Sequence, residues 1–367
     1  MGAVKKIALL LGVVFLGFVV FSPLVTFHVI MLLDFFTPFS AFESPLVAQY
    51  HEYLVSKLPD QDEIPLPELY AHNITREAFY EASKGYTFPT VVRGMLKDLD
   101  ALKKWNNASW WASEYGDEEV LCKYVNQISD GDASSCTVKS SFGSPDGSNR
   151  MYISGESRLF IRRPELQDMI ESEKVDAIAP GRAVFTQLFM GYSDMGSDVH
   201  AAVGCNLFRQ IVGRKKWWLI PVSQTPYVYP SLNPNGFSAH SKTKIGKGDE
   251  EPSPFLKKIQ RYTVTLEPGD LLLNPAWFWH GIKNLGDDPH NDLVIGVPTR
   301  YAIKNFKPAI LNNPLLTTIA MSSIAYTYGI DKFLSSADSL QKGIERARTS
   351  RAKELSAKDE ELERALA

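Results

Sequence analysis

The sequence is poor in several features that mark particular classes of protein. It has three cysteines in 367 residues, too few for a small domain built on disulfides. Neither sign of charge is in excess, with 39 Lys and Arg against 42 Asp and Glu, so the charge balance does not indicate a nucleic-acid partner. The mean hydropathy of -0.14 excludes a protein with many membrane spans. There is no internal repeat and no glycine-rich nucleotide motif.

The residues that are present indicate a folded chain. Apolar residues make up 44% of the sequence and aromatic residues 11%, whereas disordered chains are poor in aromatics and rich in one sign of charge. The length suits one large domain or two ordinary ones. The apolar residues are distributed unevenly, and this divides the chain into segments.

The N-terminal segment has the pattern of a membrane anchor. Residues 7–33 carry no charge, and at about 1.5 Å per residue a helix of this length crosses a hydrocarbon core of roughly 30 Å. Lys5 and Lys6 precede it, which by the positive-inside rule places residues 1–6 in the cytosol. We therefore expect a type II membrane protein, with the membrane as a partner and the body in the lumen of the ER, Golgi or secretory pathway. A cleaved signal peptide is the alternative.

Other features fit a lumenal body. Asn73 and Asn107 each begin a glycosylation sequon without proline. Cys122 and Cys136 flank a polar stretch that can turn, so they either close a small disulfide loop or remain free thiols. Cys205 lies in an apolar strand pattern and is expected to be a buried thiol.

The remainder of the chain divides into three parts. Residues 34–87 are rich in proline and predict a stem with short helices. Residues 88–300 contain short strand-like runs bounded by Gly and Pro, which are typical of a β-sandwich or barrel. Within them, apolar spacing predicts a helix over residues 96–111, and the polar residues 231–254 predict an insertion or lid. Residues 301–367 predict helices with a charged tail. The expected strands are residues 88–93, 120–125, 184–190, 206–212, 216–221, 261–266, 271–274 and 293–297.

Three passages in the β-rich region carry a family resemblance. The most specific is Glu-Pro-Gly-Asp-Leu-Leu followed by Pro-x-x-x-x-His, which ends at His280. The next is Asn-x-x-x-Gln-x-x-Gly-x-Lys, from Asn206 to Lys215, and the third contains Ser197 and His200. In this order they resemble the cupin-like branch of the jumonji-C (JmjC) superfamily, the Fe(II)- and 2-oxoglutarate-dependent oxygenases. The resemblance covers about residues 88–297 and implies a mainly β fold, a double-stranded β-helix (cupin or jelly-roll) barrel with flanking helices.

The resemblance also implies a site. Such oxygenases hold iron with two imidazoles and one carboxylate, leaving open positions for 2-oxoglutarate and oxygen. His200 and His280 match the two metal-binding histidines. Lys215 matches the lysine that pairs with the far carboxylate of 2-oxoglutarate, and an inward-pointing lysine needs an anion, since burial otherwise drives it neutral. Asn206 and Ser197 match positions that often form hydrogen bonds to the co-substrate.

One residue departs from the family pattern. The first motif is His-x-Asp/Glu, but here it is His200-Ala201-Ala202. Alanine cannot bind a metal, so the affinity for iron is expected to fall. Asp198 is a weak substitute: residues i and i+2 of a strand share a face, but it approaches His200 from the wrong side. Asp194 is weaker still.

Three functions are left open by this departure. The first is an oxygenase of the hydroxylase class with a modified triad, acting on a protein or a small molecule. The second is a degenerate member of the family that binds a ligand or partner without turnover. The third is a halogenase in which a halide fills the position of the missing carboxylate. The sequence does not indicate the substrate.

Overall fold

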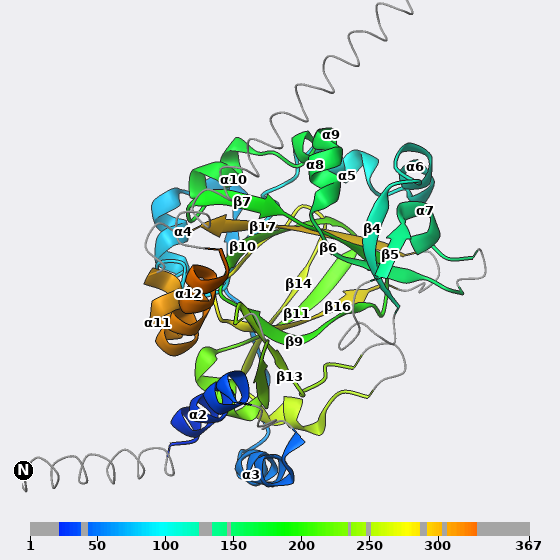
Figure 1. Ribbon diagram of the computed structural model, residues 1–367. Coiled ribbons are helices and arrows are strands. Elements are labelled where there is room, and N and C mark those ends of the chain that lie inside the picture. The colour runs from blue at the N-terminus through cyan, green and yellow to red at the C-terminus, as the bar shows by residue number, and fades with distance from the viewer. Residues whose placement is uncertain are drawn as a thin grey trace, which may run out of the picture.

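Short apolar strands build two β-sheets that face each other, with helices on their outer sides (Figure 1). The computed structural model describes residues 22–37, 43–124, 134–144, 148–233, 236–246, 251–286, 292–302 and 307–328. This mainly β architecture is consistent with the predicted jelly-roll.

Within the described residues, the smaller sheet has seven strands and the larger has ten. The smaller sheet has the order β1 (Glu63–Pro65), β14 (Arg261–Leu266), β11 (Arg214–Ile220), β16 (Trp279–Leu285), β9 (Gly196–Ala202), β13 (Ser238–Ser241), β12 (Pro230–Leu232). The larger has the order β2 (Glu68–Tyr70), β3 (Thr90–Arg93), β15 (Leu271–Asn274), β10 (Cys205–Val212), β17 (Leu293–Ala302), β8 (Leu188–Tyr192), β6 (Met151–Glu156), β4 (Glu119–Tyr124), β5 (Ser134–Thr137), and β7 (Arg182–Thr186) also pairs with β17.

The described helices are short and lie mostly outside the sheets. They are α2 (Pro23–Phe36), α3 (Pro45–Ser56), α4 (Arg76–Ala82), α5 (Asp100–Lys104), α6 (Ala108–Glu114), α7 (Val138–Ser141), α8 (Arg158–Arg162), α9 (Pro164–Asp168), α10 (Glu173–Ile178), α11 (Lys307–Asn312) and α12 (Pro314–Tyr328). Short 3-10 turns add η2 (Ala71–Asn73), η4 (Val222–Tyr227) and η5 (Pro254–Lys258).

The space between the sheets is filled by side chains from both. Phe208 and Leu272 of the larger sheet pack with Trp217 and Val264 of the smaller one. A Cβ on Gly296 of β17 would lie 2.1 Å from the Phe208 ring, so only glycine fits beneath that side chain. This packing closes one part of the barrel and leaves the polar residues described below together in another.

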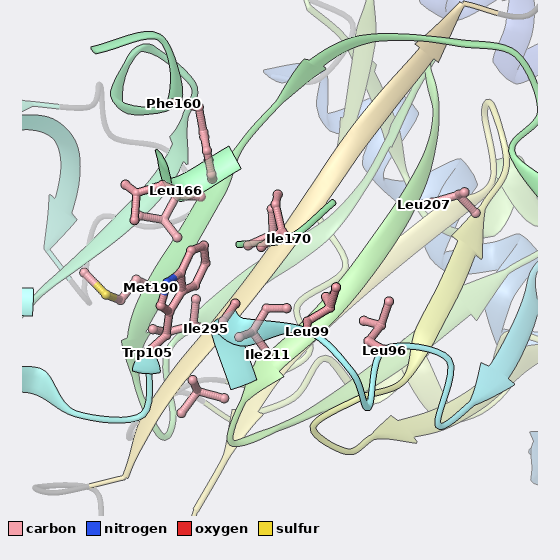
Figure 2. Packing of buried hydrophobic residues seen from close by; sticks show 14 of the residues in the cluster. Leu96, Leu99, Trp105, Phe160, Leu166, Ile170, Met190, Leu207, Ile211 and Ile295 are labelled. Carbon is pink, nitrogen blue, oxygen red and sulfur yellow. The ribbon is translucent and has the colours of Figure 1, made fainter. Parts of the chain in front are cut away.

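A separate core lies on the outer face of the larger sheet, where side chains of Trp105, Phe160 and Leu166 gather over its strands (Figure 2). The helical segments between residues 96 and 178 supply much of this cover. A third cluster, with Trp218, Trp277 and Trp279, covers the smaller sheet. The barrel is therefore held between two apolar layers, which fixes the strands that carry the site.

Most of the predicted strands are confirmed, and two predictions differ in instructive ways. β14 and β15 begin and end at the predicted residues. The single helix expected over residues 96–111 is two helices, α5 and α6, because Asn107 caps the second by accepting a hydrogen bond from Ser109 N at 2.8 Å. Part of the expected lid, residues 231–254, forms the β12–β13 hairpin of the smaller sheet, and residues 234–235 and 247–250 lie outside the described residues. The charged tail also lies outside them.

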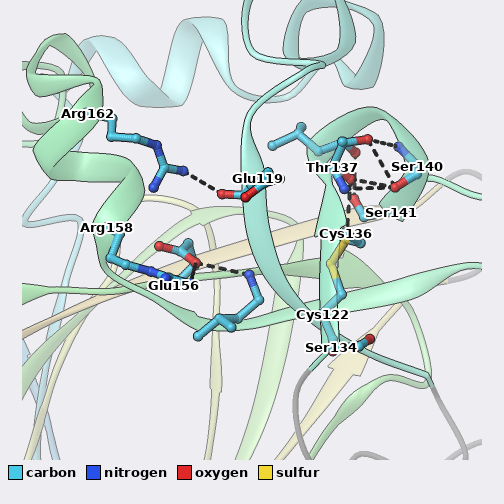
Figure 3. The surroundings of a disulfide bond; sticks show 12 residues. Glu119, Cys122, Ser134, Cys136, Thr137, Ser140, Ser141, Glu156, Arg158 and Arg162 are labelled. Carbon is cyan, nitrogen blue, oxygen red and sulfur yellow. Dashed lines mark hydrogen bonds and ion pairs between the residues drawn. A yellow bond between two sulfur atoms is a disulfide. The ribbon is translucent and has the colours of Figure 1, made fainter.

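The structure pairs Cys122 with Cys136, the alternative that the sequence left open. The bond joins the neighbouring strands β4 and β5 across 14 residues (Figure 3). Close by, the fully buried Glu156 carboxylate accepts hydrogen bonds from the Leu121 and Leu159 amides, both at 3.0 Å. The disulfide and the carboxylate together hold this edge of the larger sheet.

The predicted membrane anchor over residues 7–33, and the type II lumenal localisation that depended on it, are wrong for the described part of the chain. No helix there is long and apolar enough to cross a membrane. α2 has 14 residues, about 21 Å at 1.5 Å per residue. Phe27 and Met31, one turn apart on this helix, are fully buried against the body, which accounts for part of the apolar run. Residues 1–21 lie outside the described residues, and glycosylation at Asn73 and Asn107 remains a prediction.

Candidate functional site

The two predicted histidines lie side by side on neighbouring strands. His200 of β9 and His280 of β16 are direct partners in the smaller sheet, and their ring centroids are 4.1 Å apart. Figure 1 shows β9 and β16 in the sheet that faces β10 and β17. The antiparallel pairing thus brings together two residues that are 80 positions apart.

Both imidazoles are held in the same way. The Nδ1 atom of each lies close to a backbone carbonyl oxygen two residues earlier, at 2.8 Å from Asp198 O for His200 and 2.9 Å from Phe278 O for His280. A carbonyl oxygen only accepts, so Nδ1 carries the proton in both rings and Nε2 carries the lone pair. Burial lowers the pKa of His200 to about 4, and burial with the neighbouring His200 holds the pKa of His280 well below its usual range. The pair is neutral at pH 7.

The third position of the predicted triad has no ligand. Ala202 follows His200 on the same strand and pairs with Ser238 of β13. Asp198 does not replace the carboxylate, because its Oδ2 lies 3.3 Å from Lys244 Nζ in an ion pair. A bulge in β9 also changes the register, so Ser197 pairs with Ile282 while His200 pairs with His280. This places Ser197, and not Asp198, on the face of His200.

Sequence reasoning missed a third histidine in the same row. His240 of β13 is the direct partner of His200 on its other side, with ring centroids 6.1 Å apart. It is exposed, and its Nε2 lies 3.1 Å from Asn233 Nδ2. The only sequence signal was its position in the polar residues 231–254, which predicted an insertion.

Lys215 is fully buried on β11, beside its partner Asn284 of β16. Its Nζ donates to Asn284 Oδ1 and lies 3.4 Å from the hydroxyl of Tyr152, a buried residue of β6 that the sequence did not single out. Among the described residues, no carboxylate lies within ion-pair distance of Lys215. Burial lowers the pKa of Lys215 to about 7. An anion beside Nζ would restore the charged form.

The larger sheet contributes a polar row opposite the histidines. Asn206 of β10 is the direct partner of Asn274 on β15 and of Arg300 on β17, so the three side chains share a face. The Nδ2 atom of Asn274 lies 3.2 Å from His280 Nε2, and the charge of Arg300 lowers the pKa of both His200 and His280. The sequence predicted Asn206 as a site residue but not Asn274 or Arg300.

These residues do not fit iron. The donor set is two neutral imidazoles with an alanine in the position of the carboxylate, and a guanidinium lies close enough to act on both rings. In the parts of the chain that the structure describes, no three His, Cys, Asp or Glu side chains are placed to hold a metal ion together. A divalent cation here would lack the anionic ligand and meet a positive charge instead.

Comparisons with known proteins agree with the fold. The profile of the cupin-like domain matches residues 76–298. The human HSPB1-associated protein 1 is 40% identical over 83 residues, 22% of this chain and 17% of that protein. Its Bos taurus counterpart is 29% identical over 179 residues, 46% of this chain and 36% of that protein. The Jumonji C domain-containing protein 5 of Drosophila melanogaster is 26% identical over 210 residues, 53% of this chain and 51% of that protein. The chain therefore spans about half the length of these relatives or less.

Proposed function

Since the chain belongs to the family of cupin-like domains, we propose that its barrel binds a dicarboxylate of the 2-oxoglutarate type through Lys215 and does not turn it over with iron. The observation that carries this proposal is the burial of Lys215 without a carboxylate partner among the described residues. A buried lysine without an anionic partner destabilises the fold, so it indicates a site for an anion.

The surroundings of Lys215 support a carboxylate as this anion. Burial raises the pKa of Tyr152, so its hydroxyl keeps its proton and can donate. Asn284 is fixed from its other end, where its Nδ2 donates to Tyr192 O at 2.8 Å. Lys215 and Tyr152, both buried, together offer two donors to one carboxylate.

The missing ligand at Ala202 favours binding over turnover. The family uses iron to activate oxygen beside 2-oxoglutarate, and the histidine pair here lacks the anion that such a metal needs. The hydroxylase and halogenase alternatives both require a metal on His200 and His280. They therefore predict metal-dependent consumption of 2-oxoglutarate, and binding alone does not.

The test is a calorimetric titration of the full chain with 2-oxoglutarate. It is carried out under anaerobic conditions, with and without Fe(II). We expect saturable binding that Lys215→Ala abolishes. Lys216→Ala is the matched control, because Lys216 is the next residue of β11 and pairs with Glu63 at 2.8 Å on the other face. Succinate release after admission of oxygen is expected to be absent. If the wild type does not bind 2-oxoglutarate, or if it releases succinate with Fe(II), the proposal is wrong.

A further inference from the structure

A polar row forms one wall of the site and consists of Asn206, Asn274 and Arg300. None of these residues contacts Lys215 in the hydrogen bonds described above. Asn206 and Asn274 are 2% and 1% exposed, and the Oδ1 atom of each is buried without a hydrogen bond. A buried polar atom without a partner costs about 1–3 kcal/mol. Two such atoms on adjacent strands indicate that a polar ligand binds in this part of the barrel.

The charge of this polar row indicates what kind of ligand it binds. Arg300 is half-buried, and its Nε donates to Gln187 Oε1 at 3.1 Å. No carboxylate of the described residues lies within ion-pair distance of its guanidinium. Burial lowers the pKa of Arg300 to about 10, so it remains charged at pH 7. A cation in this position attracts an anion and repels a metal.

The Asn206 carboxamide can turn to bind the same ligand. The two ends of a carboxamide are nearly equal in size, and the hydrogen-bond partners decide which end faces which way. With a carboxylate at Arg300, the amide nitrogen of Asn206 can face it and the oxygen can turn away, while Asn274 keeps its Nδ2 toward His280 Nε2. The guanidinium and the Asn206 amide then provide several donors for one carboxylate group.

The geometry of the two sheets separates this wall from Lys215. Lys215 pairs with Asn284 on β16, four residues along that strand from His280, which Asn274 approaches. Four strand residues span about 14 Å. A Cβ on Gly296 of β17 would lie 3.0 Å from Lys215 Cε, and Arg300 follows four residues later on the same strand. The two cations therefore belong to opposite ends of one stretch of β17, where a short dicarboxylate can lie between them.

Resting on the proposed function, we infer that Arg300, with Asn206, binds the second carboxylate of the dicarboxylate directly, in place of a metal ion. The ligand is then held between two cations, and its binding does not depend on a metal.

The first test uses the wild type alone, so it does not depend on the folding of a variant. Binding of 2-oxoglutarate, glutarate and butyrate is measured by calorimetry in the presence of EDTA. We expect 2-oxoglutarate and glutarate to bind at least about tenfold more tightly than butyrate, which has one carboxylate, because a charge-assisted contact is lost. Equal affinities for glutarate and butyrate, or binding of 2-oxoglutarate only after Fe(II) or Mn(II) is added, would overturn the inference.

The second test assigns the second carboxylate to Arg300. In Arg300→Gln the preference for glutarate over butyrate should disappear, while Arg300→Lys should keep part of it. Arg158→Gln is the control, since the Arg158 side chain is 63% exposed. Thermal unfolding of each variant checks that it is folded. A preference that persists in folded Arg300→Gln refutes the role of Arg300.

The possible outcomes distinguish a failure of this inference from a failure of the proposed function. If Lys215→Ala abolishes binding and folded Arg300→Gln leaves it unchanged, the lysine site stands and the arginine site does not. If the wild type binds none of the three probes, the proposed function itself has failed.

Discussion

Replacing Lys215 with methionine is expected to stabilise the ligand-free protein while abolishing ligand binding. Methionine has nearly the length of the lysine stem and carries no charge. Residues that serve a ligand are often unfavourable for the fold that holds them, and Lys215 is fully buried without an anion among the described residues. The variant shows the two roles of Lys215 as opposite effects. Removing the buried charge should raise the stability of the ligand-free protein, and removing the contact to the ligand should abolish binding.

The magnitude follows from the pKa of the buried amine. Burial lowers it from 10.5 to about 7, and at about 1.4 kcal/mol per pH unit this difference costs about 5 kcal/mol at neutral pH. The gain on substitution is smaller, since Asn284 Oδ1 loses its donor, which costs about 1–3 kcal/mol. We therefore expect Lys215→Met to raise the free energy of unfolding by about 2–4 kcal/mol at pH 7.

The pH dependence of the stability provides an independent check on this reasoning, because its direction follows from the pKa of Lys215. The unfolded lysine holds its proton up to about pH 10.5 and the folded one only to about pH 7, so the unfolded state binds more protons between these values. The penalty is present in full below pH 7 and is relieved as the pH rises through this window. The advantage of Lys215→Met over the wild type should therefore shrink from pH 7 to pH 9.5.

Urea denaturation at pH 7 and pH 9.5, without ligand, measures both effects. Lys216→Met is the control and should change the stability by less than about 1 kcal/mol, because Lys216 lies in a partly exposed ion pair. A Lys215→Met variant that is less stable than the wild type at pH 7 would refute the reasoning, since the buried lysine would then carry no penalty. Added 2-oxoglutarate should stabilise the wild type and leave the variant unchanged.

Four further results are expected. Ala202→Asp should raise the affinity for Mn(II) by at least about tenfold in anaerobic calorimetry, and an equal gain in Ala202→Asn would show that the carboxylate is not the cause. The affinity for 2-oxoglutarate should fall about tenfold per pH unit above about pH 7, as Lys215 loses its proton while Tyr152 stays neutral; a flat profile from pH 6 to pH 9 contradicts this. Cys122→Ser should lower the free energy of unfolding by roughly 3 kcal/mol for this 15-residue loop, and a reductant should bring the wild type to the same value without affecting the variant. Met31→Asp should release α2 and speed its proteolysis, whereas Leu33→Asp, at a position 46% exposed, should not.

The parts of the site that the sequence predicted are those encoded locally. β15 and His280 lie within one passage, and Lys215 lies nine residues after Asn206, so their spacing along the chain carries the family pattern. Asn274 lies in the same passage as His280, yet its role depends on its pairing with Asn206. Such pairing is a property of the sheet and is not visible in the spacing of residues.

The parts that were missed depend on tertiary structure. Arg300 can lower the pKa of the histidines only because β17 pairs with β10, more than 80 residues away along the chain. The bulge in β9 moves Asp198 off the face of His200, against the two-residue alternation of a regular strand. Residues 23–33, the described part of the apolar run, misled for a related reason, since hydropathy does not distinguish a helix face that packs on protein from one that faces lipid.

The Arg300 guanidinium supplies about the same net charge as the metal ion and carboxylate of the family pattern together. In the family pattern, two neutral imidazoles, one carboxylate and one divalent cation carry a single net positive charge. Here the two neutral imidazoles and the Arg300 guanidinium carry the same net charge. A dicarboxylate between this group and Lys215 would therefore meet similar electrostatics in both cases, so the proposed binding does not require a metal. What it loses is the centre that activates oxygen, which is why we expect binding without turnover.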